Sequence, residues 1–347
     1  MSGQGMRGVF CWFLIGLLAI GTVGCGDRQP AGTLANGDRP ALQPEQRRSQ
    51  LKEVSPPATI QKLRQVLEDY RPQVKILSPQ PDELLQENRV SVRLEVKDLP
   101  IYQDPQLGLG PHLQVFVDDQ PYRRVFRLDE PLILEDLSPG THHLRAFAAR
   151  PWDESFKNEG AYAQATFHVF TKTPNNQPDP NLPLITYGSP QGSYGAEPIM
   201  LDFYLLNAPL HFIAKDDSQD DIPDWRIRTT INGESFLLDR WQPIYLKGFK
   251  PGQNWLKLEF LDETGSLVQN AFNLDLRLID YQPGGQDSLA RLMRGDLSAA
   301  DALGIVDPKA RQPGAAGESL VPPPGWACRC CPWLRRRKSG PSADTGT

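Results

Sequence analysis

The 347-residue sequence lacks cysteine over almost its whole length. Its five cysteines lie near the two ends, at positions 11, 25, 328, 330 and 331, and residues 26–327 contain none. A disulfide framework therefore cannot stabilise the central part, which must be held together by its own core. With 39% hydrophobic and 23% charged residues, the composition allows a sizeable core.

An excess of positive charge and the common catalytic motifs are also missing. The formal net charge is −5, whereas general nucleic-acid-binding proteins carry a basic stripe. The sequence contains no G-x-S-x-G, no H-E-x-x-H and no glycine loop of the kind that binds phosphate. We therefore expect no enzymatic activity, no cofactor and no nucleic-acid partner.

A long hydrophobic run occurs only at the N-terminus. Residues 9–20 are almost entirely apolar, follow Arg7, and lead through small residues to Cys25. This order is typical of a secretory signal peptide, because a membrane-spanning helix needs about 20 apolar residues. Residues 1–24 are predicted to be that peptide. An uncleaved anchor, or a structural role for Cys25, is the alternative.

The stretch Thr22-Val23-Gly24-Cys25 resembles the bacterial lipobox, although Thr22 stands where the usual form has Leu. The resemblance implies that Cys25 becomes the first residue of the mature protein and carries acyl chains such as palmitate. Anchoring by more than one chain is stable. We expect an extracytoplasmic, periplasm-facing lipoprotein that is tethered to a bacterial membrane without spanning it.

Segments of the sequence recur at an offset near 110 residues. KILSPQ at 75–80 matches TYGSPQ at 186–191, and PLILEDLSPG at 131–140 matches PIYLKGFKPG at 243–252. After each Pro-Gly the chain continues as HHLRAFA or NWLKLEF. These matches indicate two tandem copies of one domain.

Apolar and polar residues alternate within each copy, as they do at 90–97. A period of two predicts half-buried strands. Asn232-Gly233 is typical of a type I′ hairpin turn and aligns with Asp118-Asp119 in the first copy. We therefore predict an all-β fold of two tandem Ig-like β-sandwiches.

The Pro-Gly turn followed by x-x-Leu-Arg or x-x-Leu-Lys resembles bacterial immunoglobulin-like and fibronectin-III-like extracellular modules over residues 73–281. The whole chain, including RPWDESFKNEGAYA at 150–163, is also similar to a group of cyanobacterial lipoproteins. That second resemblance implies no particular activity.

The other segments are organised around this pair. The sequence predicts a disordered stalk at 25–57, a helix at 58–71, sandwiches at 72–171 and 184–282, a proline-rich linker at 172–183, short helices at 287–293 and 298–303 within 286–304, and a disordered tail at 305–347.

Three groups of residues invite a metal-binding interpretation. His142 and His143 are adjacent in a predicted strand and would point to opposite faces, so we do not expect them to share an ion. The acidic run at 216–221 lacks the EF-hand residues, so it is interpreted as a solvated loop, with weak calcium binding as the alternative. Zinc usually takes four ligands, and the tail supplies three. A functionless tail, an intermolecular disulfide or lipid contact by the following basic run stays open for Cys328, Cys330 and Cys331.

The candidate binding site consists of Trp152, Asp153, Glu154 and Phe156. An aromatic residue beside carboxylates is typical of sugar-binding surfaces, and loops on a rigid sandwich often carry function. We take this loop to be longer than its counterpart at 262–265. Alternatively, Trp152 covers its own core, and the same core interpretation is given to Trp225, Trp241 and Trp255.

Two functions follow from these observations. The repeat, the stalk and the missing catalytic motifs favour a membrane-tethered, non-catalytic module that binds a protein partner or has a structural role. The alternative is a glycan-binding lipoprotein that contacts cell-wall or surface polysaccharide through Trp152 and its neighbours.

Overall fold

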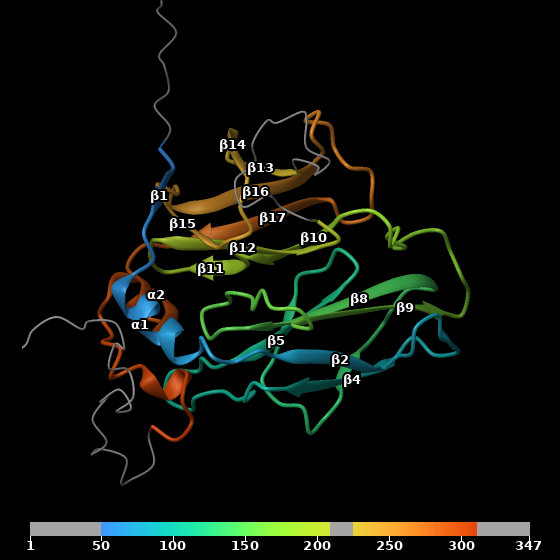
Figure 1. Ribbon diagram of the computed structural model, residues 1–347, viewed down its shortest axis with the longest axis horizontal. Coiled ribbons are helices and arrows are strands. Elements are labelled where there is room, and N and C mark those ends of the chain that lie inside the picture. Colours follow the sequence, from blue (N-terminus) through green and yellow to red (C-terminus); the bar gives the residue numbers. More distant parts are fainter. Residues whose placement is uncertain (1–49, 209–224, 311–347) are drawn as a thin grey trace, which may run out of the picture. The chain divides into compact units, whose positions relative to one another are not determined.

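The computed structural model describes residues 50–208 and 225–310. Cys25, the acidic run at 216–221 and the three tail cysteines lie outside these residues. The described part is built mostly from β-strands, with two α-helices and one 3-10 helix (Figure 1). The predicted fold of two tandem Ig-like β-sandwiches is confirmed.

The first sandwich packs a small sheet against a large one. The small sheet has the order β2–β4–β7, formed by Gln73–Ser78, Val90–Lys97 and Leu132–Leu134. The large sheet has the order β3–β9–β8–β5–β6, formed by Leu84–Leu85, Tyr162–Val169, Gly140–Ala149, His112–Val117 and Arg123–Val125. Alternate residues of both sheets, such as Val92, Leu113 and Leu144, fill the core between them.

The second sandwich repeats this arrangement strand for strand. Its small sheet contains β10 (Leu184–Ser189), β12 (Ile199–Leu206) and β15 (Ile244–Lys247). Its large sheet has the order β11–β17–β16–β13–β14, formed by Gly192–Tyr194, Leu274–Tyr281, Gly252–Leu261, Arg226–Ile231 and Glu234–Leu238. In each large sheet the short edge strand pairs in parallel with the strand that comes last in that sandwich's sequence: β3 with β9, and β11 with β17.

The predicted hairpin turn is present and is held in the same way in both copies. Asn232 and Gly233 have φ values of 50° and 92°, as a type I′ turn requires. The backbone N–H of Asn232 donates to the carbonyl of Trp255 at 3.1 Å, and that of Asp118 donates to His143 at 2.9 Å. In return, Asn232 Oδ1 accepts from the backbone N–H of Trp255, and Asp118 Oδ1 accepts from the backbone N–H of His143.

The segment before the first sandwich crosses to the second one. Strand β1 (Lys52–Val54) pairs antiparallel with β15 and extends the small sheet of the second sandwich. Residues 52–54 therefore do not belong to the predicted stalk. Helix α1 (Ala58–Val66) follows and ends earlier than predicted, because the N–H of Leu67 bonds back to Arg64 and tightens the last turn.

The segment after the second sandwich returns to the first. Helix α2 (Ser288–Arg294) is capped by Asp287, whose Oδ1 accepts from the N–H of Ala290 at 2.9 Å, and it ends at Gly295 with φ of 83°. Leu292 and Met293 of α2 join Ile60 and Leu63 of α1 in the core cluster of the first sandwich. This helix agrees with the predicted one at 287–293.

The second predicted helix, at 298–303, is wrong. Ser298 and Asp301 do exchange hydrogen bonds as a capping pair, but a turn and the 3-10 helix Leu303–Ile305 follow instead of an α-helix. Ile305 and Val306 are buried in the first core, so the tail does not begin at 305 as predicted. Burial of these apolar side chains fixes the chain there. None of the described helices is long and apolar enough to span a bilayer.

Candidate functional site

The loop at 150–161, which connects β8 to β9, carries the predicted binding residues. The exposed fractions of Trp152, Asp153, Glu154 and Phe156 are 1%, 3%, 4% and 2%. Trp152 and Phe156 belong to the core cluster of the first sandwich. The expectation of an exposed aromatic surface here is therefore wrong, and the alternative, in which Trp152 covers its own core, describes the structure.

The expected difference in loop length is also wrong. The loop at 150–161 runs from Ala149 to Tyr162, and its counterpart at 262–273 runs from Leu261 to Leu274, so both have the same length. The N–H of Phe156 donates to Ala148, and the N–H of Val268 donates to Phe260, each at 2.9 Å. The tight turn at 262–265 is only the first part of its loop.

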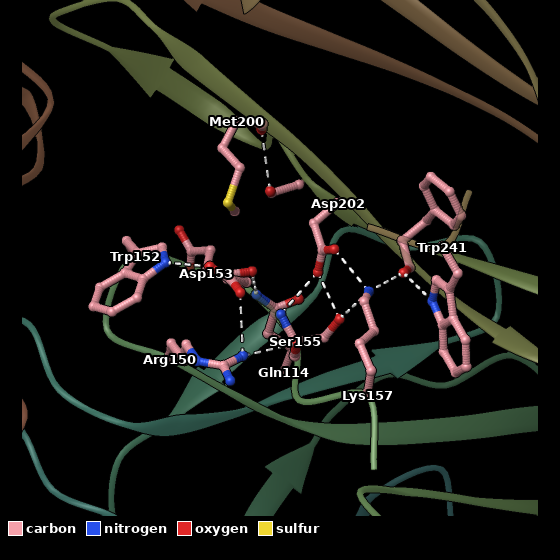
Figure 2. Close-up of polar contacts among 12 residues, drawn as sticks. Gln114, Arg150, Trp152, Asp153, Ser155, Lys157, Met200, Asp202 and Trp241 are labelled. Carbon is pink, nitrogen blue, oxygen red and sulfur yellow. Dashed lines mark hydrogen bonds and ion pairs between the residues drawn. The ribbon is translucent and has the colours of Figure 1, made fainter. Parts of the chain in front are cut away.

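A buried ion-pair cluster lies beside the indole nitrogen of Trp152 (Figure 2). Its indole Nε1 donates to Glu154 Oε2 at 2.7 Å. The same carboxylate accepts from Arg64 of α1 at 2.7 Å, and its other oxygen lies 3.2 Å from Arg150 Nη1. Two guanidinium groups thus neutralise one buried carboxylate, which satisfies the requirement that a buried charge be paired.

A second buried carboxylate, Asp153, is bound by the neighbouring strands. Arg124 of β6 donates from Nε and Nη2 to its two oxygens at 2.7 and 2.6 Å, and His112 Nε2 lies 3.2 Å away. Burial by itself raises the pKa of Asp153. The charge and hydrogen bonds of Arg124, with the nearby imidazole, outweigh burial and hold that pKa well below its usual value.

The next residues of the loop bind the second sandwich. Asp202 of β12 is fully buried, and its Oδ2 accepts from the N–H and hydroxyl of Ser155 at 2.8 and 2.6 Å. Lys157 Nζ donates to Asp202 Oδ1 at 2.7 Å (Figure 2). Burial lowers the pKa of Lys157, while Asp202 favours its charged form. The loop of one sandwich therefore satisfies a buried carboxylate of the other.

Aromatic side chains complete this junction between the sandwiches. Tyr204 of β12 stacks on Phe147 of β8 and Tyr162 of β9, with centroid distances of 5.6 and 4.8 Å. The guanidinium of Arg145 lies 4.0 Å from the ring centroid of Phe272, in the loop at 262–273. Such ring contacts stabilise beyond the area that they bury.

The central strands β5 and β8 of the first sandwich's large sheet are thus covered on both sides. Every residue of β5 and β8 is buried, because one side packs in its own core and the other meets the second sandwich. The predicted binding loop lies at the end of this covered sheet. Its residues hold two sandwiches together and offer no surface to a polysaccharide in this structure.

The two adjacent histidines point apart, as β-strand geometry requires. His142 Nδ1 and Nε2 lie 2.7 and 2.8 Å from Asp118 Oδ2 and the Ser138 carbonyl. His143 instead contacts Thr166 and stacks on Phe272 at the junction. Within residues 50–208 and 225–310, no group of three or more His, Cys, Asp or Glu side chains is arranged to hold a metal ion.

A cavity of about 390 Å³ lies at the edge of the first sandwich beside His142 and Asp118. Its lining includes Arg123, Glu135 and Asp136 but no Trp, Tyr or Phe. A pocket without a Trp, Tyr or Phe ring lacks the broad flat apolar surface on which sugar rings usually stack. This cavity therefore does not replace the predicted sugar-binding site.

Among the residues that the structure describes, no other sheet packs on the outward side of the corresponding large sheet in the second sandwich. Trp255, Leu237, Leu274, Leu276 and Leu278 are 36%, 53%, 50%, 57% and 64% exposed. The register of β16 and β17 places Trp255 opposite Leu278, and Lys257 opposite Leu276. Directly opposed residues share a side of the sheet, so these side chains form one surface. We call it the outer face.

Charges on the outer face are largely paired with one another. Arg228 donates from Nε and Nη2 to the two oxygens of Glu259, both at 2.8 Å, and Lys257 Nζ lies 3.0 Å from Glu259 Oε2. The hydrogen bond from Arg228 is the main cause that lowers the pKa of Glu259 to about 2. The polar part of the face is thus a preformed ion-pair network.

Strand β17 reverses the usual burial pattern. Its three leucines face outward, while Asp275 and Arg277 point to the same side as the core residues Leu258 and Leu256. The two charges pair at 2.7 Å, and Arg277 Nη1 donates to the carbonyl of Asp119 in the first sandwich at 2.6 Å. This contact between the sandwiches places the charges inward and leaves the leucines exposed.

The sequence interpretation missed the outer face because it assigned Trp255 to the core. A signal was available in the repeat. His143 aligns with Trp255, and Leu256, Leu258 and Phe260 are the apolar members of the alternation, so Trp255 belongs to the other side of β16. Trp225 and Trp241 are partly buried against the second core, as expected.

No protein-family model matches the chain, and no curated protein matches it significantly. Among solved structures, it is similar to the fibronectin(III)-like modules of Clostridium thermocellum CbhA, with 12% identity and a TM-score of 0.21 over 61% of this chain and 95% of that one. The D00-D0 domain of intimin gives 13% identity and a TM-score of 0.16 over 60% and 99% of the two chains.

A further similar structure is SGBP-B of the Bacteroides ovatus mixed-linkage glucan utilization locus, in complex with a mixed-linkage heptasaccharide. Identity is 14%, the TM-score is 0.18, and the match covers 60% of this chain but only 47% of the length of that protein. At such identities and TM-scores these likenesses do not extend to ligands or partners.

Proposed function

We propose that this chain is a membrane-tethered, non-catalytic interaction protein that binds a protein partner through the outer face of its second sandwich. The observation that carries the proposal is the exposed apolar surface of Trp255 and the three leucines of the adjacent strand β17. Contiguous apolar surface on a folded domain is costly in water and marks interaction sites. A twisted sheet holds these side chains in fixed positions, so little order is lost on binding.

The chemistry of the outer face favours a protein over a polysaccharide. Leucine side chains offer no hydrogen bonds to sugar hydroxyls, and Glu259 is already bound by Arg228 and Lys257. The apolar side chains of another protein match this surface better. The glycan-binding alternative relied on Trp152 and its neighbours, which are buried.

The proposed tether is a lipid on Cys25. It is supported by the signal-peptide pattern of residues 1–24 and the lipobox-like stretch that ends at Cys25. In the first described strand, β1, the chain joins the second sandwich. A tether on the N-terminal segment would therefore lead directly to the sandwich that bears the outer face.

The lipid is tested by mass spectrometry of the mature N-terminus. We expect cleavage before Cys25, an acyl mass on that residue, and recovery of the protein with membranes. Cys25→Ser should abolish the acyl mass and cleavage. A mature N-terminus elsewhere, or an unmodified Cys25, would contradict the tether while leaving the outer-face proposal intact.

Protein binding is tested by cross-linking in cells with a photoreactive residue in place of Leu276. We expect a covalent adduct to a protein from this position. The matched control is the same substitution at Leu77, an exposed leucine of β2 in the first sandwich, with 44% exposure against 57% for Leu276. A chain that forms no adduct at position 276, or equal adducts at both positions, would refute the proposed role of the outer face.

A further inference from the structure

We infer that the partner of the outer face is a second copy of this chain, so that two chains pair through the large sheets of their second sandwiches. This inference rests on the proposed function, because it names the occupant of the same surface. Three observations support it. The aligned surface in the first sandwich is covered by a β-sheet of the second sandwich. The small sheet of the first sandwich does not match the outer face, and the charges on the outer face are compatible with a second outer face.

In the first sandwich, the surface that aligns with the outer face is covered by another part of the same chain. His143, Arg145 and Phe147 of β8 align with Trp255, Lys257 and Glu259 of β16. In the first sandwich these residues are at most 2% exposed, because the small sheet of the second sandwich packs on them. The outward side of this sheet is therefore a docking surface for another β-sandwich.

The small sheet of a neighbouring first sandwich would be a poor match for the outer face. Its exposed strand positions include Lys75 and Arg93, for which no carboxylate partner is seen among the described residues, and Lys97, which pairs with Glu95 at 3.1 Å; the small sheet of the second sandwich instead presents Met200 and Tyr204 at the junction. Burying unpaired lysine and arginine against leucines is strongly unfavourable. An open head-to-tail chain of molecules is thus disfavoured.

The outer face is compatible with itself. A two-fold axis brings identical surfaces together, so the leucines of β17 would meet apolar side chains of the other copy. Within each face Glu259 is bound by Arg228 and Lys257, so these three side chains together carry a single net positive charge. Repulsion between copies is therefore small, and two sheets pack face to face at about 10 Å through interdigitated side chains.

The test is native mass spectrometry of the full mature chain, purified in detergent with a reducing agent so that the tail cysteines cannot form a disulfide. Spectra at roughly 1–100 μM should show a dimer whose fraction rises with concentration. Leu276→Lys, in the middle of the three β17 leucines, should weaken the dimer about thirtyfold or more, because it places like charges in an apolar contact. The matched control Leu77→Lys should leave the dimer unchanged.

The outcomes separate this inference from the proposed function. A wild-type chain that stays monomeric at 100 μM, or a dimer that survives Leu276→Lys, would overturn the inference. If the chain is monomeric and position 276 cross-links to a different protein in cells, the proposed function stands and self-pairing is wrong. A cross-link from 276 within the same chain would show that one of its own segments covers the face. No adduct together with a monomer would refute both proposals.

Discussion

The two sandwiches have the same strands in the same order, yet the outward side of the large sheet is buried in the first and exposed in the second. In the first, β5 and β8 are buried along their whole length. In the second, three leucines of β17 and Trp255 of β16 are exposed. The repeated topology therefore fixes which surface of each sandwich is flat and rigid. The elements that neighbour each copy determine whether that surface is covered.

Polar side chains occur on both surfaces, including the covered one. At the junction between the sandwiches, buried His143, Arg145 and Asp202 are held by hydrogen bonds, ion pairs or ring contacts. The exposed outer face carries leucines beside the ion-paired Arg228, Lys257 and Glu259. Polar groups are tolerated inside when each finds a partner, and they make the contact specific. Apolarity alone therefore does not show which surface of a repeat is buried.

The largest difference in the free energy of unfolding is expected between alanine variants of Trp152 and Trp255. Trp152→Ala removes a side chain that is 1% exposed, and we expect it to lower the free energy of unfolding by about 3–5 kcal/mol because it leaves a cavity. Trp255→Ala should cost less than about 1 kcal/mol because the ring is partly in water. Chemical denaturation of both variants measures the difference. Equal effects would contradict the assignment of Trp152 to the core and Trp255 to the surface.

The junction is tested by comparing Asp202 with Arg93, its aligned residue in β4 of the first sandwich. Asp202→Ala leaves Lys157 buried without its carboxylate, so we expect a loss of about 3 kcal/mol in unfolding free energy. Arg93 is exposed, and Arg93→Ala should change stability by less than about 0.5 kcal/mol.

Replacing both partners, Asp202→Asn with Lys157→Met, should recover most of the loss in denaturant titrations, because no unpaired charge is then left inside. If the double variant is no more stable than Asp202→Ala, the ion pair does not account for the loss.

The smallest of these effects concerns pH and the two histidines. Burial, followed by the charge of Arg145, lowers the pKa of His143 to about 4. The unfolded chain then binds a proton that the folded chain does not, so stability falls as pH drops below about 6.5, by about 2 kcal/mol at pH 5. His143→Gln should remove this slope when unfolding free energy is measured from pH 7 to pH 5.

His142 supplies the matched control. Burial lowers its pKa, but the bonds to Asp118 and the Ser138 carbonyl outweigh burial and raise it above the usual value. Its contribution is therefore complete below the unfolded pKa and is lost as pH rises through the folded pKa. His142→Asn, which copies the aligned Asn254, should keep the slope between pH 7 and pH 5. Loss of that slope in the His142 variant would show that the roles are assigned to the wrong histidine.

Much of the fold was predictable because its signals are local. Alternation at 90–97, the Asn232-Gly233 turn and the repeated Pro-Gly turns depend on neighbouring residues, and each is present in the structure. The crossing of β1 to the second sandwich was not predictable, since a three-residue strand has no pattern and its partner lies far along the chain. The helix expected at 298–303 failed because burial of Ile305 and Val306 overrode a capping signal.

The same distinction, between local sequence signals and contacts between distant residues, applies to the candidate site. The residue pattern along the chain was enough to predict an all-β protein of two related sandwiches, their strands and their tight turns, because a period of two and positive φ angles are properties of short segments. The burial of Trp152 and the exposure of Trp255 depend instead on how the folded sandwiches pack. Which side of a sheet meets another body depends on contacts between residues far apart in sequence, and alternation is the same whichever side is covered.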